Sequence, residues 1–180
     1  MRRKWMVLTA VAVVLMLAPT ASAGSAPAVV TITATVDSFA EWAVAEPSIT
    51  ADDWYAGETP GASFSAVNQT LTASLAMTLY ANVAATLTPS STGTGILTYG
   101  TETLSTSYMI TGNVTVPDSD YELAGTGSGQ FFASANTYTV TYAPGGGSYT
   151  INLLVQAVSP ADRAPDAGDY ICNVTLTASW

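Results

Sequence analysis

Apolar and polar residues alternate along most of the chain, with the period of two that is typical of a half-buried β-strand. The alternation is clearest in four runs, at residues 29–36, 71–79, 149–158 and 169–180. Threonine and valine, which suit a pleated and half-buried surface, are frequent throughout. Clusters of proline, glycine and serine separate the runs at short intervals, as in a β-sandwich or a β-barrel. The pattern therefore predicts an all-β protein with antiparallel strands.

Shorter strands and their connections are expected between these runs. One strand should cover residues 83–88 and end at Pro89, because proline lacks the N–H group that a strand donates. Residues 143–148 read A-P-G-G-G-S and are expected to form the loop of one β-hairpin. Residues 45–61 alternate less regularly and contain two prolines and two adjacent aspartates. They predict a long surface connection.

Residues 1–23 have the three parts of a secretory signal peptide. Basic residues at positions 2–4 precede an apolar stretch from Val7 to Leu17, and the small residues Ala21, Ser22 and Ala23 suit cleavage. The apolar stretch is too short to span a bilayer, and no later stretch lacks polar residues for long. We therefore expect residues 24–180 to be exported as one domain without a membrane helix. The protein would then be secreted or held at the cell surface.

The composition excludes several classes of function. After removal of the leader, Arg163 would be the only basic residue beside 13 carboxylates, which makes nucleic-acid binding untenable. The chain has no histidine, so it can form neither a Ser-His-Asp triad nor a histidine-built zinc site. Its single cysteine excludes an internal disulfide. We expect no enzymatic activity and identify no catalytic residue.

Three carboxylates at alternate positions are a candidate calcium site. If residues 118–122 are extended, Asp118, Asp120 and Glu122 project from the same side, and calcium binds clustered oxygen ligands of this kind. Their spacing differs from that of a helix-loop-helix calcium loop, and the same residues suit a solvated loop tip. The sequence therefore predicts no cofactor unless this cluster binds calcium.

The C-terminal segment carries the most specific motif in the chain. Residues 166–172 read D-A-G-D-Y-I-C, in which Asp166, Gly168 and Tyr170 resemble the tyrosine corner of immunoglobulin domains. In that corner the tyrosine hydroxyl bonds to the backbone of the preceding turn. Cys172 follows on the apolar side of the strand. It is expected to be a small buried side chain or to pair with a partner chain.

The two ends of the predicted mature chain together resemble one family. The A-G-D-Y sequence at residues 167–170, followed by the alternating run at 173–180, is similar to the terminal strand of spore coat protein U-like and fimbrial pilin subunits. Residues 29–36 resemble the N-terminal extension of the same family. The resemblance implies an immunoglobulin-like, pilin-like β-sandwich that lacks one strand. It also implies that residues 24–36 are lent to a neighbour as a donor strand, through Val30, Ile32, Ala34 and Val36.

We therefore expect an exported structural or adhesive protein, a subunit of a surface filament or layer. Its partners would be copies of itself or related surface subunits, joined by β-strand addition. Two alternatives stay open. One is a small outer-membrane β-barrel whose last strand ends at the aromatic Trp180. The other is a calcium-dependent carbohydrate-binding module with exposed Trp42, Trp54 and Tyr55 as a stacking platform.

Overall fold

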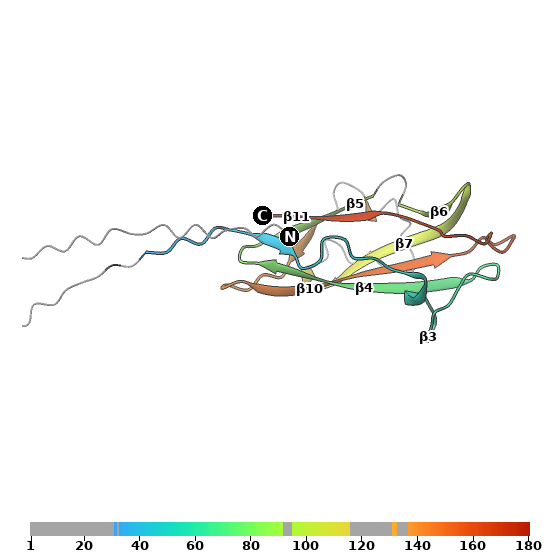
Figure 1. Cartoon of the computed structure of the whole chain (residues 1–180), viewed down its shortest axis with the longest axis horizontal. Helices are drawn as coiled ribbons and strands as arrows, with labels where there is room; N and C mark the ends of the chain where they lie inside the picture. The colour runs from blue at the N-terminus through green and yellow to red at the C-terminus, as the bar shows by residue number, and fades with distance from the viewer. Residues whose placement is uncertain (1–30, 32, 92–94, 116–130, 133–136) are drawn as a thin grey trace, which may run out of the picture. The chain divides into compact units, whose positions relative to one another are not determined.

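The computed structural model describes residue 31 and residues 33–91, 95–115, 131–132 and 137–180. The predicted signal peptide lies outside these residues. The chain divides into residues 1–35 and residues 36–180. In the first part, the described residues are exposed and belong to no strand. The second part consists of two antiparallel sheets packed around a common core (Figure 1), so the predicted all-β sandwich is confirmed.

The first sheet has seven strands, and its centre consists of three long strands that alternate in direction. Its strands in spatial order are β3 (Thr59–Pro60), β2 (Tyr55–Ala56), β4 (Thr70–Ala81), β10 (Gly147–Val158), β7 (Glu102–Gly112) and β6 (Leu97–Tyr99), and β1 (Ala40–Trp42) also pairs with β4. In the central register, Leu153 lies opposite both Leu75 and Ile110. The same period-two face of all three long strands therefore points inward.

The second sheet has four shorter strands. Their spatial order is β11 (Val174–Ser179), β5 (Thr86–Ser91), β9 (Tyr138–Val140) and β8 (Val114–Thr115). β5 continues through Pro89, where the sequence predicted an end. Proline is tolerated there because β9 pairs only with Thr86 and Leu87, so no described strand needs an N–H group from Pro89 on that side.

The hydrophobic core lies between the two sheets. Leu79, Ile110 and Ile151 from the first sheet and Leu87 from the second are completely inaccessible to solvent. Aromatic rings fill the space between them, and the centroids of the Tyr108 and Phe131 rings lie 5.3 Å apart. The core is thus supplied by both sheets and joins them into one domain.

Residues 143–148 do not form the hairpin loop that the sequence predicted. They lie between β9 in the second sheet and β10 in the first and include the first two residues of β10, and the two strands do not pair with each other. Gly145 and Gly146 have φ angles of 105° and 75°, which are accessible mainly to glycine. The glycine-rich turn was correctly placed, but alternation on both sides of a turn does not reveal which strands pair.

The β2–β3 hairpin projects from the edge of the first sheet. Ala56 pairs with Thr59 across a turn at Gly57 and Glu58, and all of these residues are exposed. The hairpin pairs with β4 through Tyr55 and Thr72 alone.

Within the described part of the chain, no helix has the length and apolar character needed to cross a membrane.

Candidate functional site

The sandwich is incompletely closed between β11, which is an edge of the second sheet, and the middle of β4 in the first sheet. β1 pairs with Leu79–Ala81 at one end of β4, and β2 pairs with Thr72 near the other end. No described strand pairs with this edge of β4 in between. Residues 43–54 cross the gap instead, and the Ala43 N–H group donates a hydrogen bond of 2.9 Å to the Thr78 carbonyl. The middle of β4 therefore has no strand partner on this side among the described residues.

β11 is an edge strand in the described structure. It pairs with β5 along one side, and its other side has no strand partner. From residue 171 through β11, side chains alternate between exposed and half-buried, and the inward-facing set is Cys172, Val174, Leu176 and Ala178. An unpaired edge of this kind presents free backbone N–H and C=O groups in the pattern that a further strand requires.

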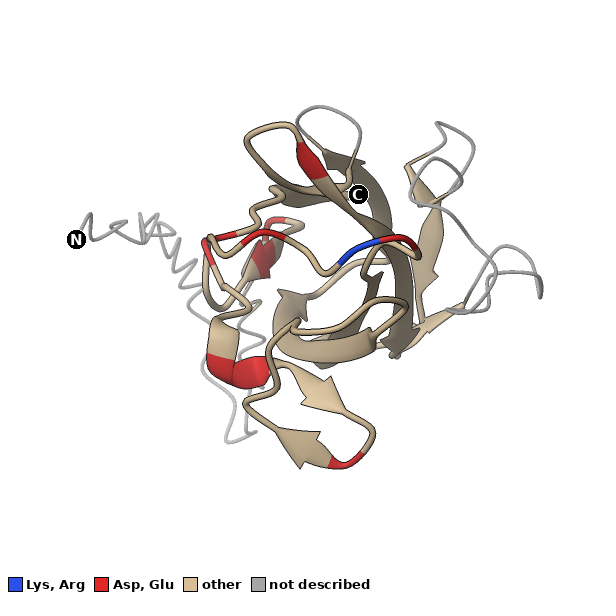
Figure 2. Ribbon diagram, turned by 90° about the vertical axis from the view of Figure 1, so that its right-hand side faces the viewer, with Lys and Arg blue, Asp and Glu red and all other residues tan. Residues whose placement is uncertain are grey.

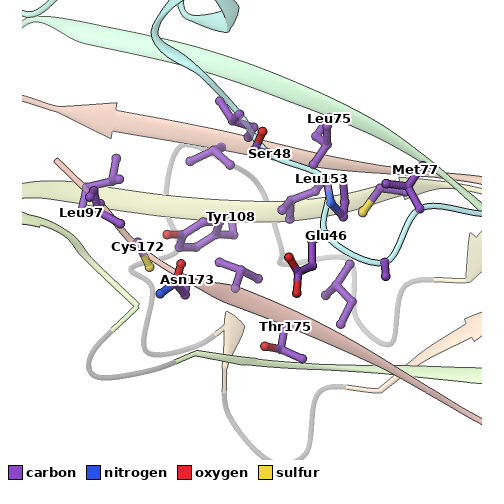
Figure 3. A pocket seen from close by; sticks show the side chains of 18 of the residues that line it. Glu46, Ser48, Leu75, Met77, Leu97, Tyr108, Leu153, Cys172, Asn173 and Thr175 are labelled. Carbon is purple, nitrogen blue, oxygen red and sulfur yellow. The ribbon is translucent and has the colours of Figure 1, made fainter. Parts of the chain in front are cut away.

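An open groove of about 820 Å³ lies between these two edges (Figure 3). Its apolar lining comes from the first sheet through Leu75, Met77 and Leu153, and from the β11 segment through Val174 and Leu176. Leu75, Met77, Val174 and Leu176 are only half-buried, although they pack against the core. The groove therefore exposes inward-facing residues of both sheets to solvent.

Tyr108 and Cys172 lie side by side at one end of the groove (Figure 3). Tyr108 is 2% exposed, and this burial, together with the neighbouring Cys172 thiol, raises the pKa of Tyr108 far above its ordinary value. Cys172 is half-buried and free. The structure thus covers Cys172 less completely than the sequence predicted, and its thiol borders the groove.

The predicted strand-exchange residues fall in two groups. Val30 and Ile32 lie outside the described residues. Ala34 and Val36 are exposed, with Val36 79% accessible, and residues 33–39 belong to no strand. No structural finding tests the exchange itself, which stays a prediction.

Asn82 fixes the backbone that precedes β1. Its side-chain oxygen accepts a hydrogen bond of 2.8 Å from the Phe39 N–H group, and its side-chain amide donates one of 2.9 Å to the Asp37 carbonyl. The Asn82 N–H group also donates to the Phe39 carbonyl. These three bonds attach residues 37–39 to the domain, directly after the predicted donor segment.

The predicted tyrosine corner is a packed junction at the other end of β11. The Tyr170 ring lies 5.7 Å from that of Tyr99, which also covers Gly168 so closely that a side chain there would overlap it. Thr98 and Ile171 exchange two backbone hydrogen bonds. Arg163, the blue segment in Figure 2 and the only described cation, forms an ion pair with Glu102 that raises the pKa of Arg163.

The corner hydrogen bond itself is not formed among the described residues. The Tyr170 hydroxyl is buried and has no hydrogen-bond partner there. Its pKa is raised by burial and then by the Glu102 and Asp166 carboxylates, while the nearby Asp166 N–H group opposes the shift. The Asp166 backbone therefore influences the hydroxyl, although no hydrogen bond joins the two groups.

Tyr170→Phe should change the free energy of unfolding by less than about 0.5 kcal/mol. Removing a buried hydroxyl that has no partner sacrifices no bond, whereas a formed hydrogen bond contributes about 1 kcal/mol. Urea titration of both proteins measures the difference. A loss of about 1 kcal/mol would show that the hydroxyl does bond to the turn, as the sequence motif predicted.

The remaining candidate residues are the proposed calcium ligands and the proposed aromatic platform. Asp118, Asp120 and Glu122 lie outside the described residues, and the part of the chain that is described contains no group of acidic, cysteine or histidine side chains suited to a metal ion. Trp42 and Trp54 are half-buried, pack against the core and border the groove, while Tyr55 is exposed. The two tryptophans are therefore half-buried rather than exposed as the sequence predicted, and the carbohydrate-binding alternative stays untested.

The sequence predicted the strand faces that form the two walls of the groove, but not the groove itself. Leu75 and Met77 belong to one predicted face, and Cys172, Val174 and Leu176 belong to another. Nothing in that pattern reveals an unpaired edge.

No family model matches the chain, and no curated protein or solved structure is significantly similar to it.

Proposed function

We propose that this chain is an exported structural subunit of a surface filament or layer that assembles by β-strand addition. The observation that carries the proposal is the groove between β4 and β11, because it combines a free strand edge with half-buried apolar side chains. In strand addition, backbone hydrogen bonds supply affinity and alternate side chains fill the pockets. The role is non-enzymatic and needs no cofactor.

The proposed donor is the segment at residues 29–36 of another copy. Its apolar face has four residues, Val30, Ile32, Ala34 and Val36, spaced like the four inward-facing residues from Cys172 to Ala178. Successive inward residues of a strand are about 6.6 Å apart in both. The donor therefore matches the length over which residues 172–178 present their inward-facing side chains.

The burial pattern supports a donor that leaves its own chain. Thr31 and residues 33–36 are exposed. The exposed Val36 side chain therefore contributes no hydrophobic stabilisation to its own chain. Burying Val30, Ile32 and Val36 in a neighbour would contribute about 1.5–3 kcal/mol for each side chain. The predicted leader supports export, and the single basic residue after it argues against a partner with a phosphate backbone.

The single thiol of the chain allows a direct test. The mature chain, residues 24–180, should form filaments or sheets in electron micrographs. An excess of peptide 29–36, added before assembly, should leave monomers. In the chain with Ile32→Asp, whose own segment cannot fill the groove of a neighbour, the same peptide should slow the reaction of Cys172 with a maleimide. A scrambled peptide of the same composition is the control. Monomers in the absence of peptide, together with unchanged labelling in its presence, would contradict the proposal.

A further inference from the structure

One charged side chain borders the groove. Among the described residues that line it, only Glu46 carries a charge, and Figure 3 shows its carboxylate between the β4 side and the β11 side. Glu46 is exposed to solvent and has neither an ion pair nor a hydrogen bond with any described residue. Its carboxylate therefore retains its full capacity to accept hydrogen bonds from a strand that enters the groove.

The segment that carries Glu46 is hydrogen-bonded near both ends, and Ile49 within it packs against the core. At one end, the Ala43 N–H group bonds to the Thr78 carbonyl. At the other, the N–H and hydroxyl groups of Thr50 both donate to the Asp53 carboxylate at 2.7 Å, which lowers the pKa of Asp53. Residues 44–49 make no backbone hydrogen bond with the described part of the chain. Glu46 can thus shift by a small distance without breaking a bond.

The proposed donor presents a suitable row of groups to this position. When its apolar face points into the groove, Thr31, Thr33 and Thr35 point outward. Each hydroxyl can donate a hydrogen bond, and a bond to a carboxylate is stronger than one between neutral groups. The first carboxylate of the donor chain is Asp37, one residue beyond the alternating run.

We infer that Glu46 selects the strand that fills the groove, by accepting a hydrogen bond from a donor threonine and by repelling a carboxylate at the same position. The inference rests on the proposed function. It identifies the preferred occupant as a strand with an apolar face and an uncharged, hydroxyl-bearing face. In so acidic a protein, this selection excludes segments that carry aspartate or glutamate from the groove.

A double-mutant cycle tests the selection. The acceptor is the mature chain with Ile32→Asp, which cannot donate its own segment, and the probe is fluorescent peptide 29–36. Peptides with Thr31, Thr33 or Thr35 replaced singly by valine or aspartate are compared by anisotropy. For at least one position, we expect the valine peptide to bind about tenfold more weakly and the aspartate peptide more weakly still. Glu46→Gln in the acceptor should reduce both losses at least threefold.

The controls separate the two possible failures. Glu41→Gln removes a carboxylate from β1 that does not line the groove and should leave every affinity unchanged. If the unmodified peptide binds but no threonine position responds to Glu46→Gln, the selection by Glu46 is wrong while strand addition stands. If the unmodified peptide neither binds nor protects Cys172 from the maleimide, strand addition fails, and the role of Glu46 fails with it.

Discussion

Ile32→Asp is expected to abolish assembly while changing the free energy of unfolding of the monomer by less than about 0.5 kcal/mol. Ile32 is at the centre of the alternating donor segment, so in the assembled state its side chain would be buried in the groove. A carboxylate buried without a partner is disfavoured by several kcal/mol, whereas an exposed one has little effect. The described neighbours, Thr31 and Thr33, are exposed in the single chain.

Electron microscopy and sedimentation measure assembly, and urea titration measures the stability of the monomer. Ser38→Asp is the matched control, because it adds the same charge at an exposed position just beyond the donor segment. The control should assemble normally. Filaments formed by the Ile32→Asp chain, or unfolding of its monomer, would contradict the donor role of residues 29–36.

Leu79→Ala should lower the free energy of unfolding by about 2–5 kcal/mol, whether or not the groove is filled. Leu79 is completely buried between the sheets, so its truncation leaves a cavity that the surrounding core cannot close. A domain of this size is stable by only about 5–15 kcal/mol. The single substitution therefore removes a large share of the stability.

Leu75→Ala, on the same strand, separates core packing from groove binding. Leu75 is half-buried at the groove, so we expect its truncation to lower the stability of the free monomer by only about 1 kcal/mol. With peptide 29–36 bound, the same truncation should become more costly by at least about 1 kcal/mol, since Leu75 would then be fully covered. Urea titrations with and without peptide measure both values. Equal effects of Leu75→Ala in the two titrations would show that the peptide does not cover this residue.

The long strands could be predicted from the sequence because their burial is one-sided. Residues 71–79 and 149–158 alternate apolar and polar side chains, and both lie within long strands of the first sheet with one face in the core. A one-residue shift would turn that whole face toward water, so the register is encoded in the pattern. The run at 169–180 is a strand only from Val174, because the residues before it form the packed corner.

The pairing of the strands could not be predicted in the same way. Residues 143–148 have the composition of a hairpin loop, yet they connect the two sheets, because the partner of β10 is the distant β4. Likewise, Leu75 and Leu79 follow the same alternation, but only Leu79 is covered completely. The difference arises because β1 pairs with Leu79 and no described strand pairs with Leu75 on that side. The groove therefore depends on tertiary pairing that local periodicity does not specify.

The β2–β3 hairpin offers a place for the insertion of foreign sequence. Its turn at Gly57 and Glu58 is exposed, and neither residue lines the groove or belongs to the proposed donor segment. The backbone at Gly57 has a φ angle of 62°, so an insertion is better placed after Glu58 than before it. A longer loop at such a turn adds only a small closure entropy. If the chain assembles as proposed, an epitope or an enzyme tag inserted there would be repeated once per subunit of the filament or layer.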